Sequence, residues 1–221
     1  MATTVKRRYH SPAREAAAHH TRSRIREVAE HLFIEQGYVS TTIRQIADVA
    51  SVGVRTVFAA FPDGKAQLFA ESLDFALGGD EERIPVALRP VTQDVLAESE
   101  GESAVVALVE GASDLYERAG ALITTYLESA GADSVMRDHA DRGAAEATRI
   151  MHRVARSLHQ HGALRDDISI REAGDLLLAL CSPQVHQILR RRRRWTADRY
   201  RRWLTEAITL TLLEAPDSPA G

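Results

Sequence analysis

The stretch of residues 42–61, TIRQIADVASVGVRTVFAAF, constrains the fold of this chain more than any other. Its apolar residues recur at helical spacing in two short runs, separated by an interruption at Ser51-Val52-Gly53. Pro62 ends the second run, because proline disfavours helical dihedrals in the residue before it. Two short helices joined by a tight turn are typical of a helix-turn-helix, whose second helix can enter the major groove of DNA. An ordinary helical hairpin in an all-α core is the alternative.

The flanking sequence predicts a further helix on each side of this pair. Residues 21–38 place apolar side chains on one helical face, and Gly37 is positioned to end that helix. Thr41 and Thr42 are candidates to cap the first short helix, and residues 65–69 open another helix after the break. A helix-turn-helix embedded between two longer helices is therefore expected.

Taken together, these residues resemble the DNA-binding domain of the tetracycline-repressor (TetR) family. The resemblance extends over about 50 residues at fixed spacing, which is far more specific than a single short motif. It rests on Phe33, Gly37, Tyr38, Thr41, Thr42, Ile46, Ala47, Ala50, Val52, Val54, Arg55, Thr56, Val57, Phe58, Phe61, Pro62, Lys65, Leu68 and Phe69. It implies an all-α protein with an N-terminal three-helix helix-turn-helix DNA-binding domain and a C-terminal helical bundle for ligand binding and dimerisation.

Composition shifts along the chain suggest where its domains begin and end. We expect a flexible basic arm at 1–20, the DNA-binding domain with its linking helix at 21–78, a junction loop at 79–91, an effector-binding and dimerisation domain at 92–214, and a tail at 215–221. The arm is either a solvated tail or a contact to phosphate or the minor groove of DNA.

Charge and cysteine content indicate which partners and which cellular compartment suit this chain. Residues 1–65 carry a net charge of +4 and residues 66–221 one of −7, as expected for a phosphate-facing domain attached to a separate sensor domain. The sequence has no run of 18 apolar residues that would indicate a membrane span. Cys181 is the single cysteine, so it cannot form an internal disulfide; it is either a small buried hydrophobe or a redox sensor. We expect a protein of the bacterial cytoplasm that associates with DNA and not with a membrane.

Candidate DNA-binding residues follow from the helix ends. Arg55 lies near the start of the second short helix, and arginine pairs bidentately with guanine. Helix N-termini bind phosphate, which places Lys65 and one of the two threonines before the first short helix at the DNA backbone. The predicted DNA-binding set is Thr41, Thr42, Gly53, Val54, Arg55, Thr56, Phe58 and Lys65.

The rest of the chain predicts helices but gives weaker site signals. The expected helices are 92–99, 103–118, 119–130, 134–161, 170–194 with a kink or break at Pro183, and 197–213. Apolar and adaptable side chains on them suit either a loosely shaped ligand pocket or a plain core: Leu122, Tyr126, Met136, Met151, Leu178 and Cys181.

The TetR resemblance also implies a two-fold dimer built on the last two long helices. The last helix is apolar nearly all round, and such helices are buried in one core or against a partner. The expected dimer interface is Leu177, Val185, Ile188, Leu189, Tyr200, Trp203, Leu204 and Ile208.

Catalytic and metal-binding signatures do not occur in the sequence. The histidines lack the i, i+4 pairing of helical metal sites, and no phosphate-loop, dinucleotide or nucleophile-elbow motif is present. We therefore expect no enzyme activity, no cofactor and no metal. The run Arg190–Arg194 is either the solvated end of a helix or a second nucleic-acid contact.

The sequence thus predicts a sequence-specific transcriptional regulator of double-stranded DNA. The expected form is a homodimeric repressor that a small-molecule effector, not identifiable from the sequence, releases from a near-palindromic operator. A helical DNA-binding or interaction protein that responds to a protein partner is the alternative.

Overall fold

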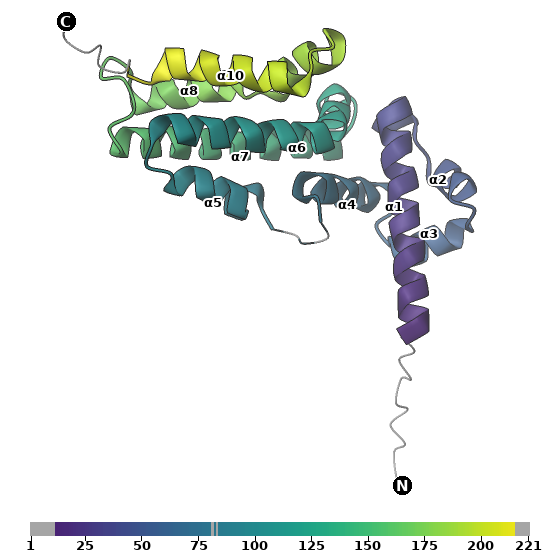
Figure 1. Cartoon of the computed structure of the whole chain (residues 1–221). Helices are drawn as coiled ribbons and strands as arrows, with labels where there is room; N and C mark the ends of the chain where they lie inside the picture. The colour runs from purple at the N-terminus through teal and green to yellow at the C-terminus, as the bar shows by residue number, and fades with distance from the viewer. Residues whose placement is uncertain (1–11, 81, 83, 215–221) are drawn as a thin grey trace, which may run out of the picture. The chain divides into compact units, whose positions relative to one another are not determined.

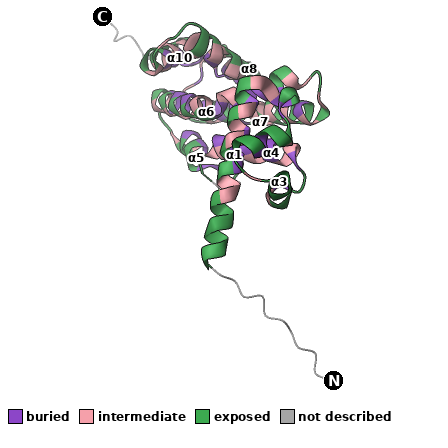
Figure 2. Ribbon diagram, turned by 90° about the vertical axis from the view of Figure 1, so that its right-hand side faces the viewer, coloured by how far each residue is buried: buried purple, intermediate pink, exposed green. Residues whose placement is uncertain are grey.

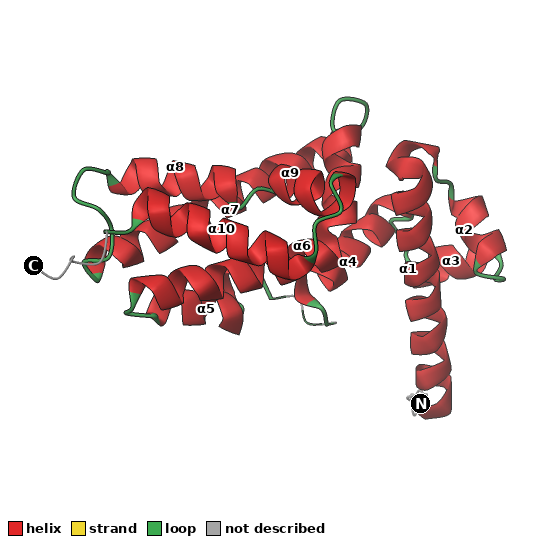
Figure 3. Cartoon of the chain, turned by 45° about the horizontal axis from the view of Figure 1, so that its top comes forward, coloured by secondary structure: helices red, strands yellow, loops and turns green. Residues whose placement is uncertain are grey.

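The computed structural model describes residues 12–80, 82 and 84–214, and the chain divides into two compact units, Met1–Ser72 and Leu73–Gly221. We call these the N-terminal unit and the C-terminal unit. Helices connected by loops and turns make up the described residues of both units (Figure 3), and one isolated bridge joins Leu164 to Leu213.

The N-terminal unit contains α1 (Pro12–Ser40), α2 (Ile43–Val49) and α3 (Val54–Ala60), and the first two turns of α4 (Lys65–Gly78), up to Ser72. The regular part of α1 stops at Gly37, whose φ of 82° is a conformation that glycine adopts without a steric penalty. Residues 12–20, which were expected in the basic arm, form the first turns of α1, and this helix begins at Pro12. The remainder of that expected arm lies outside the described residues.

The core of the N-terminal unit is built from the apolar faces predicted for these helices. Phe33, Tyr38 and Phe69 contact one another, with ring centroids 5.3–5.6 Å apart. Around them lie further side chains that are fully buried: Ile25, Ala29, Ile46, Ala47, Ala50, Val57, Phe61 and Leu68. This core holds α2 and α3 beside α1 (Figure 1).

The C-terminal unit is a bundle of longer helices. After the short 3-10 helix η1 (Val86–Leu88), its helices are α5 (Pro90–Ala97), α6 (Gly101–Ser129), α7 (Ser134–Gln160), α8 (Ile170–Leu180), α9 (Pro183–His186), the π-helix η2 (Gln187–Arg192) and α10 (Ala197–Leu212). Helix α6 packs against α5, α7 and α10, and α8 packs against α7 and α10.

One expected break is absent from the structure and another is present. Helix α6 is continuous where two helices were expected, since Gly120 continues the helical backbone without a break. The helix expected at 170–194 is broken at Pro183, as predicted: α8 ends before it, and Ser182 caps α9, which continues into η2, by accepting from the Val185 amide. Asp133, Ser169 and Thr196 cap α7, α8 and α10 by accepting hydrogen bonds from backbone amides of those helices.

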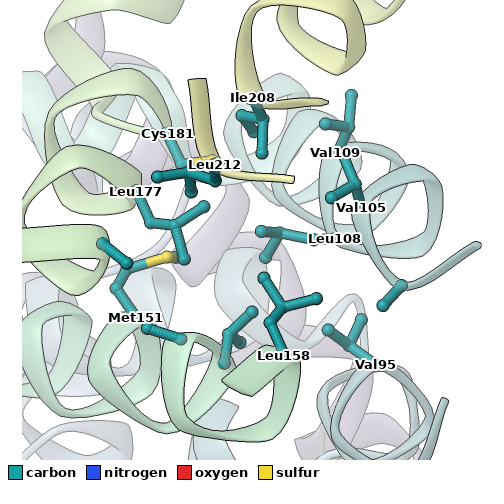
Figure 4. Packing of buried hydrophobic residues seen from close by; sticks show 14 of the residues in the cluster. Val95, Val105, Leu108, Val109, Met151, Leu158, Leu177, Cys181, Ile208 and Leu212 are labelled. Atoms are coloured by element: carbon teal, nitrogen blue, oxygen red, sulfur yellow. The ribbon is translucent and has the colours of Figure 1, made fainter. Parts of the chain in front are cut away.

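One hydrophobic core occupies the centre of the C-terminal unit. Figure 4 shows side chains from α5, α6, α7, α8 and α10 pointing toward one another, with Val105, Leu108, Met151, Leu177 and Ile208 among them. Leu204, Leu212 and Tyr200 of α10 belong to the same cluster. The described residues contain no helix that is both long and apolar enough to cross a membrane.

Candidate nucleic-acid interface and sensor unit

The helix-turn-helix is fixed by local hydrogen bonds at each of its ends. Thr42 caps α2 in a capping box: its hydroxyl accepts from the Gln45 amide (3.2 Å) and its own amide donates to the Gln45 side chain (2.8 Å). In the turn, Ser51 has a φ of 53° and the Val52 amide donates to the Ala47 carbonyl (2.9 Å). The angle between α2 and α3 is therefore set by caps and turns within residues 42–54.

Helix α3 presents most of its residues to solvent. Val57 is the one residue of α3 that is fully buried, whereas the side chains of Val54 and Phe58 are 41% and 46% exposed. Arg55 and Thr56 are also exposed, and α3 is drawn mostly in the colour of exposed residues in Figure 2. In the described part of the structure, Arg55 has no intramolecular hydrogen bond or ion pair. The structure therefore brings Gly53, Val54, Arg55, Thr56 and Phe58 together on one solvent-facing helix.

Thr41, which was predicted to contact DNA, does not face solvent. It is fully buried, and its hydroxyl donates to the Gly37 carbonyl (2.8 Å) and accepts from the Gln36 amide (3.2 Å). The neighbouring Thr42 is exposed. Consecutive threonines thus have different roles: Thr41 joins the end of α1 to the core, and Thr42 is placed at the solvent-facing N-terminus of α2.

Lys65 stands at the first position of α4 and is partly engaged within the protein. Its ammonium group donates to the Tyr38 carbonyl (3.0 Å) and lies 4.2 Å from the centroid of the Tyr38 ring. The lysine therefore ties α4 to the end of α1 while its half-exposed stem stays at the surface. Its charge lies at the N-terminus of α4, where a helix dipole also favours an anion.

Arg22 of α1 is a structural residue that the sequence analysis missed. Its guanidinium donates to both carboxylate oxygens of Glu71 (2.7 and 2.6 Å) and to the carbonyl of Ala60, the last residue of α3. It also lies 4.1 Å from the centroid of the Phe61 ring. Arg22 thus holds the C-terminal end of α3, but its partners are 38 to 49 residues away and no local pattern indicates them.

The six predicted ligand residues do not form a single group. Met151 and Cys181 belong to the central core and Leu178 packs against it, whereas Leu122, Tyr126 and Met136 are buried outside that cluster. Burial raises the pKa of the Cys181 thiol to about 12, so it stays protonated at neutral pH. The described residues also contain no group of three or more histidine, cysteine or acidic side chains that is able to hold a metal ion.

An open groove of about 350 Å³ lies elsewhere in the C-terminal unit. Its lining comes from the junction before α5 and from α7, and consists of Pro85, Ala87, Leu88, Glu146, Arg149, Ile150 and Arg153. None of the six predicted ligand residues lines it. Arg89, which follows the lining residue Leu88, donates to the carbonyl of Gly78 (3.2 Å), the last residue of α4, and to the carboxylate of Asp80 (2.9 Å).

A buried polar cluster joins α6 to the segment between α8 and α10. The Nε2 atom of His186 lies 3.3 Å from a carboxylate oxygen of Glu117, and Arg190 donates to the same oxygen (2.5 Å). Burial lowers the pKa of His186, and the negative charge of Glu117 offsets only part of that effect. Burial raises the pKa of Glu117, but the hydrogen bond and the charge of Arg190 outweigh it, so the pKa lies below its ordinary value.

The predicted dimer residues divide into core and surface. Leu177, Leu204 and Ile208 are fully buried, and Tyr200 is 1% exposed, so these four pack inside the protomer. Val185, Leu189 and Trp203 are half-buried, and Ile188 is 47% exposed. The most exposed apolar residue of α10 is Leu210, at 79%, which the interface prediction did not include.

Comparisons with known proteins find a family match for the N-terminal domain and solved structures similar to the whole fold. Residues 25–72 match the family described as bacterial regulatory proteins, tetR family. No curated protein matches the chain. Among solved structures, a regulator from Saccharomonospora viridis in complex with choline is 20% identical, with a TM-score of 0.67 over 89% of this chain and 100% of that one.

Two further structures are similar to nearly the whole chain. NalD of Pseudomonas aeruginosa, the secondary repressor of the MexAB-OprM multidrug efflux pump, is 22% identical, with a TM-score of 0.66 over 90% of this chain and 98% of that one. SmeT in complex with triclosan is 18% identical, with a TM-score of 0.64 over 91% of this chain and 98% of that one. At these identities the similarity establishes the shared fold.

Proposed function

We propose that this chain, which is a TetR-family transcriptional regulator, binds a near-palindromic operator as a homodimer and is released from it by a small molecule. The observation that carries the proposal is the solvent-facing surface of α3, on a helix-turn-helix whose orientation is fixed by its caps and by Arg22. A regulator needs its recognition helix both rigid and uncovered, and α3 has these two properties.

Base recognition is assigned to Arg55, with Gly53, Val54, Thr56 and Phe58 as its neighbours on the DNA. An arginine near the start of a recognition helix can pair with the O6 and N7 atoms of guanine. Val54 and Phe58 are exposed apolar side chains on the same helix, and apolar contacts with thymine methyl groups are a second way to read the major groove. This set gives α3 both a polar and an apolar contribution to specificity.

Contacts to the phosphate backbone are assigned to Thr42 and Lys65. Both stand at helix N-termini, where amide groups point outward and the helix dipole favours negative charge. Thr41 is left out of this assignment because it is buried. Phosphate contacts of this kind set the register of the protein on DNA without reading its sequence.

A homodimer follows from the short length of α3, since a helix of seven residues contacts few base pairs. Two copies related by a two-fold axis would place their recognition helices about 34–36 Å apart, one turn of DNA, and require a near-palindromic site. We assign the dimer contact to the outward-facing apolar residues next to and on α10, namely Ile188 and Leu210, with Val185, Leu189 and Trp203 at their edges.

The effector site is assigned to the C-terminal unit. Structures of similar fold hold choline in one case and triclosan in another. Of the predicted pocket residues, Leu122, Tyr126 and Met136 lie outside the central core cluster, whereas Met151, Leu178 and Cys181 belong to it or pack against it. An effector that binds the C-terminal unit better in a conformation with a different operator spacing would shift the protein away from DNA.

Two measurements test the proposal. In vitro selection from a genomic duplex library should enrich a near-palindrome with half-sites about one helical turn apart. A thermal-shift screen of small amphipathic compounds should raise the unfolding midpoint with at least one of them, because a ligand of the folded state stabilises it. Selection without any enriched motif would overturn operator recognition. If no compound shifts the midpoint but a co-purified protein does, regulation by a protein partner replaces regulation by an effector.

A further inference from the structure

A basic segment, residues 187–203, stands out from the rest of the C-terminal unit. It contains eight arginines and one aspartate, a net charge of +7. The remaining residues of Leu73–Gly221 contain ten basic and 23 acidic residues. A strong positive charge is thus concentrated in 17 consecutive residues on a unit that is otherwise acidic, and the proposed regulator function assigns no role to this charge.

Two arginines of the basic segment attach it to one face of α6. Arg190 donates to Glu117 (2.5 Å) and to the carbonyl of Trp195, and Arg201 donates to Asp114 (2.5 Å). Asp114 and Glu117 are three residues apart, so they lie on the same side of their helix. These ion pairs give the segment a fixed position, and they use only two of its eight arginines.

Five of the other six arginines carry their charge at the solvent-exposed surface. Arg191, Arg192, Arg193 and Arg194 are exposed, and within residues 12–80, 82 and 84–214 the structure records no hydrogen bond or ion pair for their side chains. Arg202 is likewise exposed. Neighbouring like charges repel one another, and a neighbouring acid, Glu117, is already hydrogen-bonded to Arg190, so most of the charge of these four adjacent guanidinium groups is not neutralised within the fold. An external polyanion would neutralise it.

We infer that the basic segment binds the phosphate backbone of duplex DNA, independently of base sequence, as a contact separate from α3. Duplex DNA carries a dense line of phosphates, and arginine forms paired hydrogen bonds with phosphate oxygens. A narrow basic segment on an acidic unit fits a thin rod, whereas a flat anionic membrane would also meet the surrounding acidic surface.

The aromatic residues of the segment favour a duplex over a single strand. Single-stranded nucleic acids are bound largely by stacking of bases on open aromatic rings. The ring of Trp195 is covered by the Arg199 guanidinium, 4.0 Å from its centroid, and contacts the Trp203 ring edge-on, with centroids 5.9 Å apart. These rings support the segment from within, so the exposed arginines are left to contact phosphate groups.

The test measures binding of the full chain to a duplex of about 30 base pairs without operator sequence, between about 50 and 300 mM salt. The variant replaces four exposed arginines by glutamine: Arg191→Gln, Arg192→Gln, Arg193→Gln and Arg194→Gln. Since each neutralised phosphate contributes about 0.9 to the slope of log affinity against log salt, the slope should become shallower by about 3 to 4. Affinity at about 0.1 M salt should fall at least tenfold.

A matched control removes four exposed arginines elsewhere in the same unit: Arg142→Gln, Arg153→Gln, Arg156→Gln and Arg171→Gln. It should change the slope by less than about one. Replacing Arg191–Arg194 by lysines, which keeps the charges, should retain the wild-type slope to within about one. An equal change in the glutamine variant and its control would overturn the inference, and so would loss of binding in the lysine variant.

Three further measurements keep the test decisive. If the fourfold glutamine variant does not fold, the double variant Arg192→Gln/Arg193→Gln should still reduce the slope by about two. Wild-type protein that binds phosphatidylglycerol vesicles more tightly than duplex at equal salt would overturn the DNA assignment in favour of a membrane. Arg55→Ala separates this contact from operator recognition, because it should alter the selected motif while changing the non-operator slope by at most about one.

Discussion

Helices α3 and α10 both carry runs of apolar residues, and the fold uses them in opposite ways. Helical spacing in α3 places Val54 and Phe58 on the same face as the buried Val57, yet both are more than 40% exposed. In α10, residues assigned to a partner interface, such as Leu204 and Ile208, are fully buried in their own protomer. What remains for a partner is therefore decided by what the protomer's own core has already covered.

The largest expected effect contrasts the two helices directly. Leu204→Ala should lower the free energy of unfolding by about 2–5 kcal/mol, because it leaves a cavity in the central core. Phe58→Ala should lower it by only about 1 kcal/mol or less, because nearly half of this side chain is exposed. Urea denaturation of the two variants measures the difference, and equal losses would show that the exposed face of α3 is part of a core.

Adjacent threonines sharpen the comparison within the N-terminal unit. Thr41→Val should lower the free energy of unfolding by about 1 kcal/mol by removing a buried hydroxyl from its partners, and should leave DNA affinity unchanged. Thr42→Ala should have a similar effect on stability through the lost cap, and should in addition weaken DNA binding. Thermal unfolding and anisotropy titrations test the pair, and reduced DNA affinity in folded Thr41→Val would contradict the buried role.

The outward face of α10 provides a third test. Leu210→Glu should leave protomer stability within about 0.5 kcal/mol, because the side chain is exposed, while weakening dimerisation by about tenfold or more. Sedimentation velocity across a dilution series measures the association. The control is Arg202→Glu, which places a glutamate at another exposed position of α10. Thr205→Glu would be less informative, because Thr205 is half-buried. A dimer that resists Leu210→Glu would place the interface on another surface.

The smallest expected effect is a pH dependence from the buried polar cluster. Because the pKa of His186 is lowered in the folded state, the unfolded chain takes up a proton below pH 6.5, the ordinary pKa, that the folded chain resists. Stability from neutral His186 is therefore present above that pH and lost as the pH falls below it. His186→Gln should flatten this part of the pH profile of unfolding, and an unchanged profile would assign the acid loss to other groups, such as His139.

Local signals explain which parts of the fold were predictable from sequence. The cap at Thr42 and the end of the first helix at Gly37 depend on neighbouring residues, and the structure confirms both. The exposure of Phe58 could not be predicted from the sequence, because helical periodicity identifies an apolar face but does not show which element covers it. The hydrogen bonds of Arg22 to the Ala60 carbonyl and to Glu71 join residues far apart along the chain, and no spacing rule predicts such pairs.

The same reasoning explains the mixed outcome for the candidate sites. The solvent exposure of most candidate DNA-binding residues was predictable, because the helix-turn-helix motif fixes both the elements and their solvent-facing ends. Of that set, only Thr41 is placed inside the protein. Ligand and dimer residues were chosen for being apolar, a property shared with every core residue, so Tyr200, Leu204 and Ile208 entered the interface set although they pack within the protomer. The π-helix after α9 has no sequence signature that the helical period detects.

The central claim, that α3 reads operator DNA, is tested most directly by parallel binding-site selection with wild-type protein and Arg55→Ala. The variant should enrich the same near-palindromic spacing, with preference relaxed at one base pair in each half-site and affinity reduced by about 1–3 kcal/mol. The arginine is exposed, so the variant should fold as the wild type does. An unchanged motif selected at unchanged affinity would contradict the assignment of base recognition to Arg55.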